Sequence, residues 1–266
     1  ALSYTISEPL ERLNQDDFLT LCYVRNQLKI TQNIQKIEIF IDKKISDETL
    51  LDLLQCLFCQ NDILSCITLN NKMEAPFEKS ILYLAENILP SIQHLKEFAF
   101  IFPNAKLTPK AYQSLTQSLL KLANNLTLLA FQINCPDLDS SSLQKFFVSL
   151  PNSQLFGFGI NSQAFNDEVL DVLISTLPSL KNLESFQLFI NNSRVTDSYV
   201  RKLFQSLPQE WSLSLKRLDV SLIGTQITDE SLKEFMNQTL PQLKNLEEFK
   251  ISTDRTHVTS TMKEKI

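Results

Sequence analysis

A twelve-residue segment occurs twice in this chain, 63 residues apart, with most of its residues unchanged. The first copy, 177–188, reads LPSLKNLESFQL, and the second, 240–251, reads LPQLKNLEEFKI. A weaker copy, LKRLDV, begins midway between them at residue 215. Self-similarity at a fixed period indicates a solenoid, in which each unit buries its apolar face against the next. We therefore predict one continuous array of repeats.

Aligning the chain on the pattern Leu-x-x-Leu-x-Leu-x-x-Asn, in which each Leu stands for any large apolar residue, gives eight starts at spacings of 27 to 32 residues. Each copy contains an alternating apolar segment, which predicts a short strand with one buried face. The repeats start at Ile34, Leu64, Leu95, Leu126, Ser153, Leu183, Leu215 and Leu246. The predicted buried pairs are Ile37/Ile39, Ile67/Leu69, Phe98/Phe100, Leu129/Phe131, Phe156/Phe158, Phe186/Leu188, Leu218/Val220 and Phe249/Ile251.

Between the strands, the apolar spacing changes to that of a helix. Hydroxyl residues that can act as helix N-caps occur at Ser46, Thr108, Thr196 and Thr228. Leu-Pro pairs follow at the expected helix ends, because Pro disfavours helix in the residue before it. Acidic residues recur at the helix starts, where the helix dipole favours negative charge, namely Asp47, Asp167, Asp197 and Asp229. We therefore expect a helix after each strand.

These residues resemble leucine-rich repeats, and the repeat length near 30 with a full helix after each strand resembles the ribonuclease-inhibitor-like class. The resemblance covers residues 34–257. It implies an α/β solenoid curved into a horseshoe, with a parallel sheet on the concave side and helices on the convex side. It also implies that an Asn after each strand satisfies backbone groups in the turn. Only the middle repeats keep it, at Asn134, Asn161 and Asn191, so we expect looser turns at both ends.

The chain divides into residues 1–33, predicted to be an N-terminal capping segment, and residues 34–266, predicted to be the repeats in one continuous domain. Apolar residues in 11–29 have helical spacing and are interpreted as a helix that covers the first strand, which solenoids need for solubility. The alternative is a separate docking helix for a partner. Because a further helix begins after Thr256, either another repeat follows in a longer chain or another protein covers this edge.

Composition argues against several classes of partner. The net charge is −5, and no basic run could follow a phosphate backbone, so nucleic acid is not predicted as the primary partner. The apolar runs are shorter than the roughly 18 residues that span a bilayer, so no membrane span is predicted. Five cysteines show no pairing pattern and no export signal is visible, so we expect a reducing compartment, the cytoplasm.

We predict neither enzyme activity, nor a cofactor, nor a metal. Cys56 and Cys59 form a Cys-x-x-Cys motif near Cys66, but a second pair of ligands at comparable spacing is missing, so we interpret them as core residues. His94 and His257 lie far apart in the array. The sequence contains neither a Gly-x-Ser-x-Gly motif nor a phosphate-binding loop.

The residues that alternate with the buried pairs should point toward the open, concave face. They are charged at both ends of the array and apolar or small in the centre, and an exposed apolar patch with a polar rim marks an interaction site. Glycine here would let a partner backbone come close. The predicted partner-binding residues are Ile101, Leu128, Ala130, Leu155, Gly157, Gly159 and Phe189. Alternatively, the small residues only relieve crowding, or Phe102 and neighbouring loops cover this floor.

The resemblance implies a non-enzymatic protein-interaction module, acting as a scaffold or as a subunit of a larger multi-subunit assembly. Two alternatives stay open. Some proteins of this class join the repeats to an adaptor-binding segment and serve as the substrate-receptor arm of a ubiquitin ligase, although residues 1–30 match an F-box poorly. The repeats could also be the regulatory domain of a multidomain enzyme.

Overall fold

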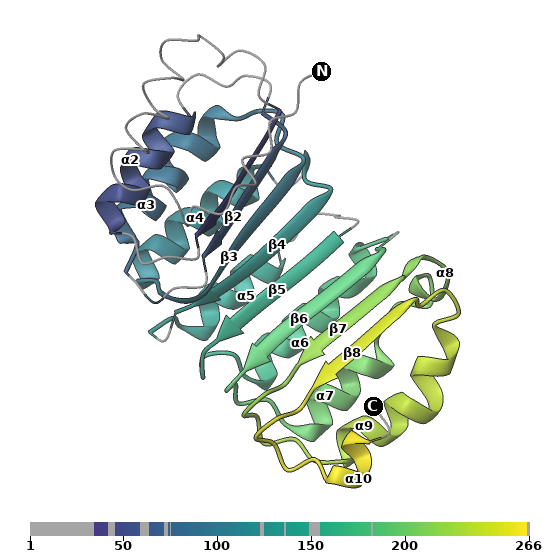
Figure 1. Ribbon diagram of the computed structural model, residues 1–266. Coiled ribbons are helices and arrows are strands. Elements are labelled where there is room, and N and C mark those ends of the chain that lie inside the picture. The colour runs from purple at the N-terminus through teal and green to yellow at the C-terminus, as the bar shows by residue number, and fades with distance from the viewer. Residues whose placement is uncertain are drawn as a thin grey trace.

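Eight parallel strands form one open sheet, and they occur in the sheet in the same order as in the chain. Among the residues that the structure describes, helices lie on one face of the sheet and leave the other face uncovered (Figure 1). The computed structural model describes residues 35–41, 46–58, 64–71, 74, 76–122, 125–135, 137–148, 155–181 and 183–264. The predicted α/β solenoid, with a concave parallel sheet and convex helices, is confirmed. The predicted capping segment, residues 1–33, lies outside the described residues.

The strands pair in the register that the sequence repeat predicts. The strands are β1 (Lys36–Ile41), β2 (Cys66–Asn71), β3 (Glu97–Lys106), β4 (Leu128–Asn134), β5 (Leu155–Asn161), β6 (Ser185–Asn191), β7 (Arg217–Ser221) and β8 (Glu248–Ser252). The first residues of the eight predicted buried pairs lie side by side from Ile37 to Phe249, and the second residues do so from Ile39 to Ile251. The eight-repeat alignment is therefore confirmed strand by strand.

Helical segments connect the strands on the convex side. They are α2 (Asp47–Phe58), α3 (Glu78–Tyr83), α4 (Pro109–Leu122), α5 (Ser140–Val148), α6 (Asp167–Thr176), α7 (Asp197–Gln205), α8 (Trp211–Ser214), α9 (Glu230–Glu234) and α10 (Ser260–Lys263). Three of the Leu-Pro pairs lie in short 3₁₀ turns that end a helical segment, at Leu89–Ser91, Leu177–Ser179 and Leu240–Gln242. These turns confirm that Leu-Pro marks the helix ends.

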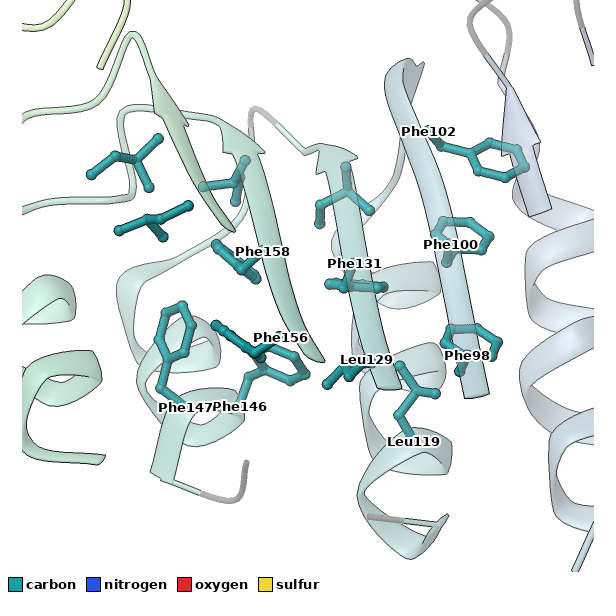
Figure 2. Close-up of a cluster of buried hydrophobic side chains, with 14 of the residues drawn as sticks. Phe98, Phe100, Phe102, Leu119, Leu129, Phe131, Phe146, Phe147, Phe156 and Phe158 are labelled. Carbon is teal, nitrogen blue, oxygen red and sulfur yellow. The ribbon is translucent and has the colours of Figure 1, made fainter. Parts of the chain in front are cut away.

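Aromatic side chains fill the core between the sheet and the helices (Figure 2). Phe147 of α5 packs against Phe158 of β5 with ring centroids 4.8 Å apart. Phe102 is fully buried and stacks on Phe100 at 4.2 Å, on the core side of β3. Phe102 therefore does not cover the concave face, which removes one of the alternatives raised by the sequence.

Acidic residues at the helix starts bind the next repeat as well as their own helix. Asp197 accepts hydrogen bonds from both the backbone N–H and the hydroxyl of Thr228, at 2.9 and 2.8 Å, 31 residues further along the chain. The same two bonds link Asp167 to Thr196 and Asp229 to Thr259. The recurrence of Asp therefore reflects cohesion between repeats in addition to the helix dipole.

Of the four predicted caps, two are confirmed and two are wrong. The hydroxyls of Ser46 and Thr108 accept the backbone N–H groups three residues on, at 3.1 and 3.2 Å. Thr228 is not the cap of α9, since Asp229 occupies the N-cap position and makes no side-chain cap bond.

Thr196 makes no side-chain cap bond, and its hydroxyl donates to the carboxylate of Asp167 in the preceding repeat. Donation alone does not prevent capping, since the hydroxyl of Thr259 donates to Asp229 and also accepts the backbone N–H of Met262.

The role that the resemblance implies for Asn, satisfying backbone groups in the turn after the strand, is visible after β6. The side-chain oxygen of Asn191 accepts the backbone N–H of Ile223 at 3.1 Å and the hydroxyl of Ser221 at 2.7 Å. The turn after β7 has Ile223 in place of Asn, and its Gly224 N–H still donates to Asp254 O at 2.9 Å. This turn therefore keeps a backbone hydrogen bond to the next repeat without the Asn, and the expectation of looser turns at both ends stays a prediction.

We predict that Asp197→Ala lowers the free energy of unfolding by about 1–3 kcal/mol, because it removes two charge-assisted hydrogen bonds between repeats. Asp171→Ala is the matched control, since Asp171 only pairs with Lys202 on the exposed surface of the neighbouring helix. That change should cost less than about 1 kcal/mol. Urea denaturation of the two variants checks this, and equal losses would contradict the role given to Asp197.

Candidate functional site

The concave face is a grid of side chains, because the strands are in register and alternate residues point to the same side. The first row contains Lys36, Cys66, Glu97, Leu128, Leu155, Ser185, Arg217 and Glu248. The second contains Glu38, Thr68, Ala99, Ala130, Gly157, Gln187, Asp219 and Lys250. The third contains Phe40, Asn70, Ile101, Gln132, Gly159, Phe189, Ser221 and Ser252.

A shallow hollow of about 110 Å³ lies in the first two rows, over β4, β5 and β6. Leu155 at its edge is 36% exposed, which is high for a large apolar residue in the middle of a sheet. A Cβ atom added to Gly157 would meet its neighbours only at 3.7 Å, an ordinary contact distance, so the space above this glycine is open. The hollow is lined by Leu128, Leu129, Ala130, Leu155, Phe156, Gly157, Ser185 and Gln187.

The third row does not extend this hollow. Gln132 lies between Ile101 of β3 and Gly159 of β5, and its side chain covers Gly159. A Cβ atom on Gly159 would lie 2.5 Å from Cγ of Gln132, so this glycine makes room for the glutamine and is itself buried. Of the seven predicted residues, the structure brings Leu128, Ala130, Leu155 and Gly157 together in the hollow and places Ile101, Gly159 and Phe189 outside it.

Charged side chains flank the hollow on the C-terminal side. Nη2 of Arg217 lies 3.3 Å from the Oε1 atom of Glu248 and 3.7 Å from the Oδ2 atom of Asp219. Arg217 therefore forms ion pairs with two carboxylates, and the closer one, Glu248, is on the neighbouring strand. On the other side of the hollow, Glu97 of β3 is exposed and lies next to Leu128.

Asp219 is the least satisfied polar group on this face. It is only 4% exposed, and no described residue donates a hydrogen bond to its Oδ1 atom. Burial raises the pKa of the Asp219 carboxyl, and the nearby Lys250 and Arg217 oppose this shift without cancelling it. A buried carboxylate with an unmet acceptor costs free energy, so the fold alone does not favour Asp at this position. Such groups mark candidate functional sites.

The sequence did not single out Asp219, Ser185 or Gln187. The alternation places all three on the concave face, but Asp219 there looks like one more charge of the polar rim. Its register neighbours are Gln187 of β6 and Lys250 of β8, which belong to the repeats before and after it. One feature of the sequence could have indicated this carboxylate: Arg217, a possible ion-pair partner, lies two residues before it and on the same face of the strand.

The described residues offer little other chemistry. Cys66 and Cys135 are buried free thiols, and burial raises the pKa of each to about 12. Within the described ranges, His, Cys, Asp and Glu side chains nowhere gather in a group of three that could hold a metal ion. Nor does any helix there have the length and apolar character needed to cross a membrane. Cys59 and the side chain of Cys56 lie outside what the structure describes.

Comparison with known proteins adds one structural likeness. No protein-family model matches the chain. A search of curated proteins also found no match. Similar solved structures include one described as the crystal structure of the Rad7 and Elc1 complex in yeast, with 15% sequence identity and a TM-score of 0.34. The match covers 91% of this chain and 64% of that chain, so this chain spans less than two thirds of its length. At this level of similarity, the likeness carries no inference about function.

We predict that Asp219→Asn raises the free energy of unfolding at pH 7, because the amide removes a buried charge and keeps the shape. The folded-state pKa of Asp219 is raised above the unfolded value near 4, so the cost of the carboxylate is present at neutral pH and vanishes below about pH 4. The difference between variant and wild type should shrink in the same way.

Denaturant unfolding at pH 7 and at several lower pH values checks this. Glu38→Gln is the matched control, since it removes a carboxylate from the same row that is paired with Lys36 at 3.1 Å. That control should bring no gain in stability. A less stable Asp219→Asn protein at pH 7 would contradict the prediction.

Proposed function

We propose that the protein is a non-enzymatic protein-interaction module, a scaffold or a subunit of a larger assembly, which binds a protein partner on its concave face. One observation carries the proposal: the open face of the sheet contains an apolar hollow between Leu128 and Leu155, surrounded by polar and charged side chains. Solvent-exposed apolar surface with a polar rim is typical of interaction sites.

The shape of the hollow favours an anchor side chain from the partner. Ala130 and Gly157 are small, so the floor is low between Leu128 and Leu155. Fully burying a side chain the size of Leu or Phe contributes about 1.5–3 kcal/mol. Residues buried at the centre of an interface, with a rim that excludes water, usually supply most of the binding energy. This arrangement supports binding at the centre of the array, over β4, β5 and β6.

The proposal extends to class and compartment. Repeats of 27 to 32 residues with a helix after each strand, and the turn role of Asn191, support leucine-rich repeats of the ribonuclease-inhibitor-like class in residues 34–266. The buried free thiols of Cys66 and Cys135 support a reducing compartment such as the cytoplasm. The N-terminal segment 1–33 would then act as the cap of the array.

Affinity purification from the native cells, with wild-type and variant proteins compared, tests the proposal. Leu128→Asp puts a charge in the hollow and Gly157→Phe fills it, so both should lose the co-purifying protein while the far-ultraviolet circular dichroism stays unchanged. Lys36→Ala, at the far end of the same face, should retain it. If the partner binds the Leu128→Asp protein as well as the wild type, the concave-face site is wrong.

A further inference from the structure

The unsatisfied carboxylate of Asp219 lies close to the apolar hollow. Asp219 lies beside Gln187 of β6 in the strand register, and Gln187 lines the hollow next to Gly157 of β5. Neighbouring strands are about 4.8 Å apart, so β7 lies about 10 Å from β5. An extended peptide advances about 3.3 Å per residue. Alternate residues of an extended segment point to the same side, so a segment crossing the sheet with one side chain over Gly157 has its next sheet-facing side chain two residues, or about 7 Å, further along. A long Lys or Arg side chain at that position can reach the remaining few ångströms to Asp219.

The charged side chains around Asp219 leave its carboxylate incompletely paired, although it is enclosed while Arg217 stays in place. The charged groups facing it are Arg217 on its own strand and Glu248 and Lys250 on β8, whereas Ser185 and Gln187 on β6 are uncharged. Arg217 lies closer to Glu248 than to Asp219, and its Nε atom also has no hydrogen-bond partner among the described residues. Within the described ranges, both partners therefore keep an unmet hydrogen-bonding atom, Nε of Arg217 and Oδ1 of Asp219.

This inference rests on the proposed function: we propose that the partner is an extended peptide segment with a large apolar side chain for the hollow and, two residues along, a Lys or Arg that pairs with Asp219. The incoming cation takes the place of the Arg217 guanidinium, which turns toward Glu248. The cation then pairs with the carboxylate from the position where Arg217 contacts Oδ2, and a charge-assisted hydrogen bond in an enclosed site is strong.

The alternative of an anionic partner is disfavoured by the same face. Glu97 and Glu248 lie on the two sides of the hollow and would repel a phosphate, and the cations on the Glu248 side, Arg217 and Lys250, already lie near the carboxylate of Asp219. The raised pKa of Asp219 gives the site a pH signature. A bound cation favours the ionised carboxylate, so binding should weaken as the pH falls through the pKa of Asp219. A variant without this carboxylate should show no such pH dependence of binding.

The experiment selects peptides from a random phage-displayed library on the purified full chain, and then measures the enriched sequences as synthetic peptides by calorimetry. Enriched peptides should contain a large apolar residue with Lys or Arg two positions away. Asp219→Asn should weaken their binding about tenfold or more and remove its pH dependence. Replacing the peptide's basic residue by Gln should cause the same loss in the wild type and little further loss in Asp219→Asn.

Glu38→Gln is the control for net charge, because it removes a carboxylate from the same row at the other end of the sheet, and it should bind like the wild type. Because Asp219→Asn is expected to be more stable than the wild type, weaker binding would not result from unfolding. Peptides that lose affinity for Leu128→Asp but bind Asp219→Asn normally would overturn the cation pairing and leave the proposed function intact. Normal binding to Leu128→Asp would instead remove the concave-face site. Failure to enrich apolar-basic peptides would also overturn the inference.

Discussion

The repeats of this protein complete the hydrogen bonds of their strands and helix starts with groups of the neighbouring repeats. Each strand leaves backbone groups that only its neighbours can pair, and Asp197 reaches into the following repeat to bind Thr228. Because this dependence recurs at every step, the strands are held in one register across the whole sheet. Stability in such an array is the sum of units and their interfaces. The interfaces contain the polar bonds, and the aromatic core supplies the apolar burial.

The common register has a direct consequence for function. It aligns side chains from eight repeats into rows, so a surface feature can be built from single residues of several strands. The hollow arises in this way, from large residues at Leu128 and Leu155 beside small ones at Ala130 and Gly157. No single repeat contains it. The convex helices contribute by covering the other face, which leaves the concave side as the uncovered surface of the sheet (Figure 1).

Asp219 shows how stability and binding can conflict on such a face. Its carboxylate is buried beside Arg217, and burial raises its pKa. In the free protein, an uncharged residue of the same shape at this position would make the fold more stable. A partner that supplies a cation would reverse this preference, because the carboxylate then gains a charge-assisted hydrogen bond. The cost in the free protein and the gain in the complex come from the same carboxylate.

The sequence by itself determined the number of repeats, the register and the face to which each strand residue points, because a period of two within strands repeats at a period near 30 along the chain. It also placed Leu128, Ala130, Leu155 and Gly157 on one surface. Only the tertiary structure decided that Gln132 covers Gly159, that the Thr196 hydroxyl binds Asp167, and that Asp219 is enclosed. These outcomes depend on side-chain positions in adjacent repeats, where residues about 30 apart in sequence meet, and a repeat pattern specifies which residues are neighbours without specifying how their side chains pack.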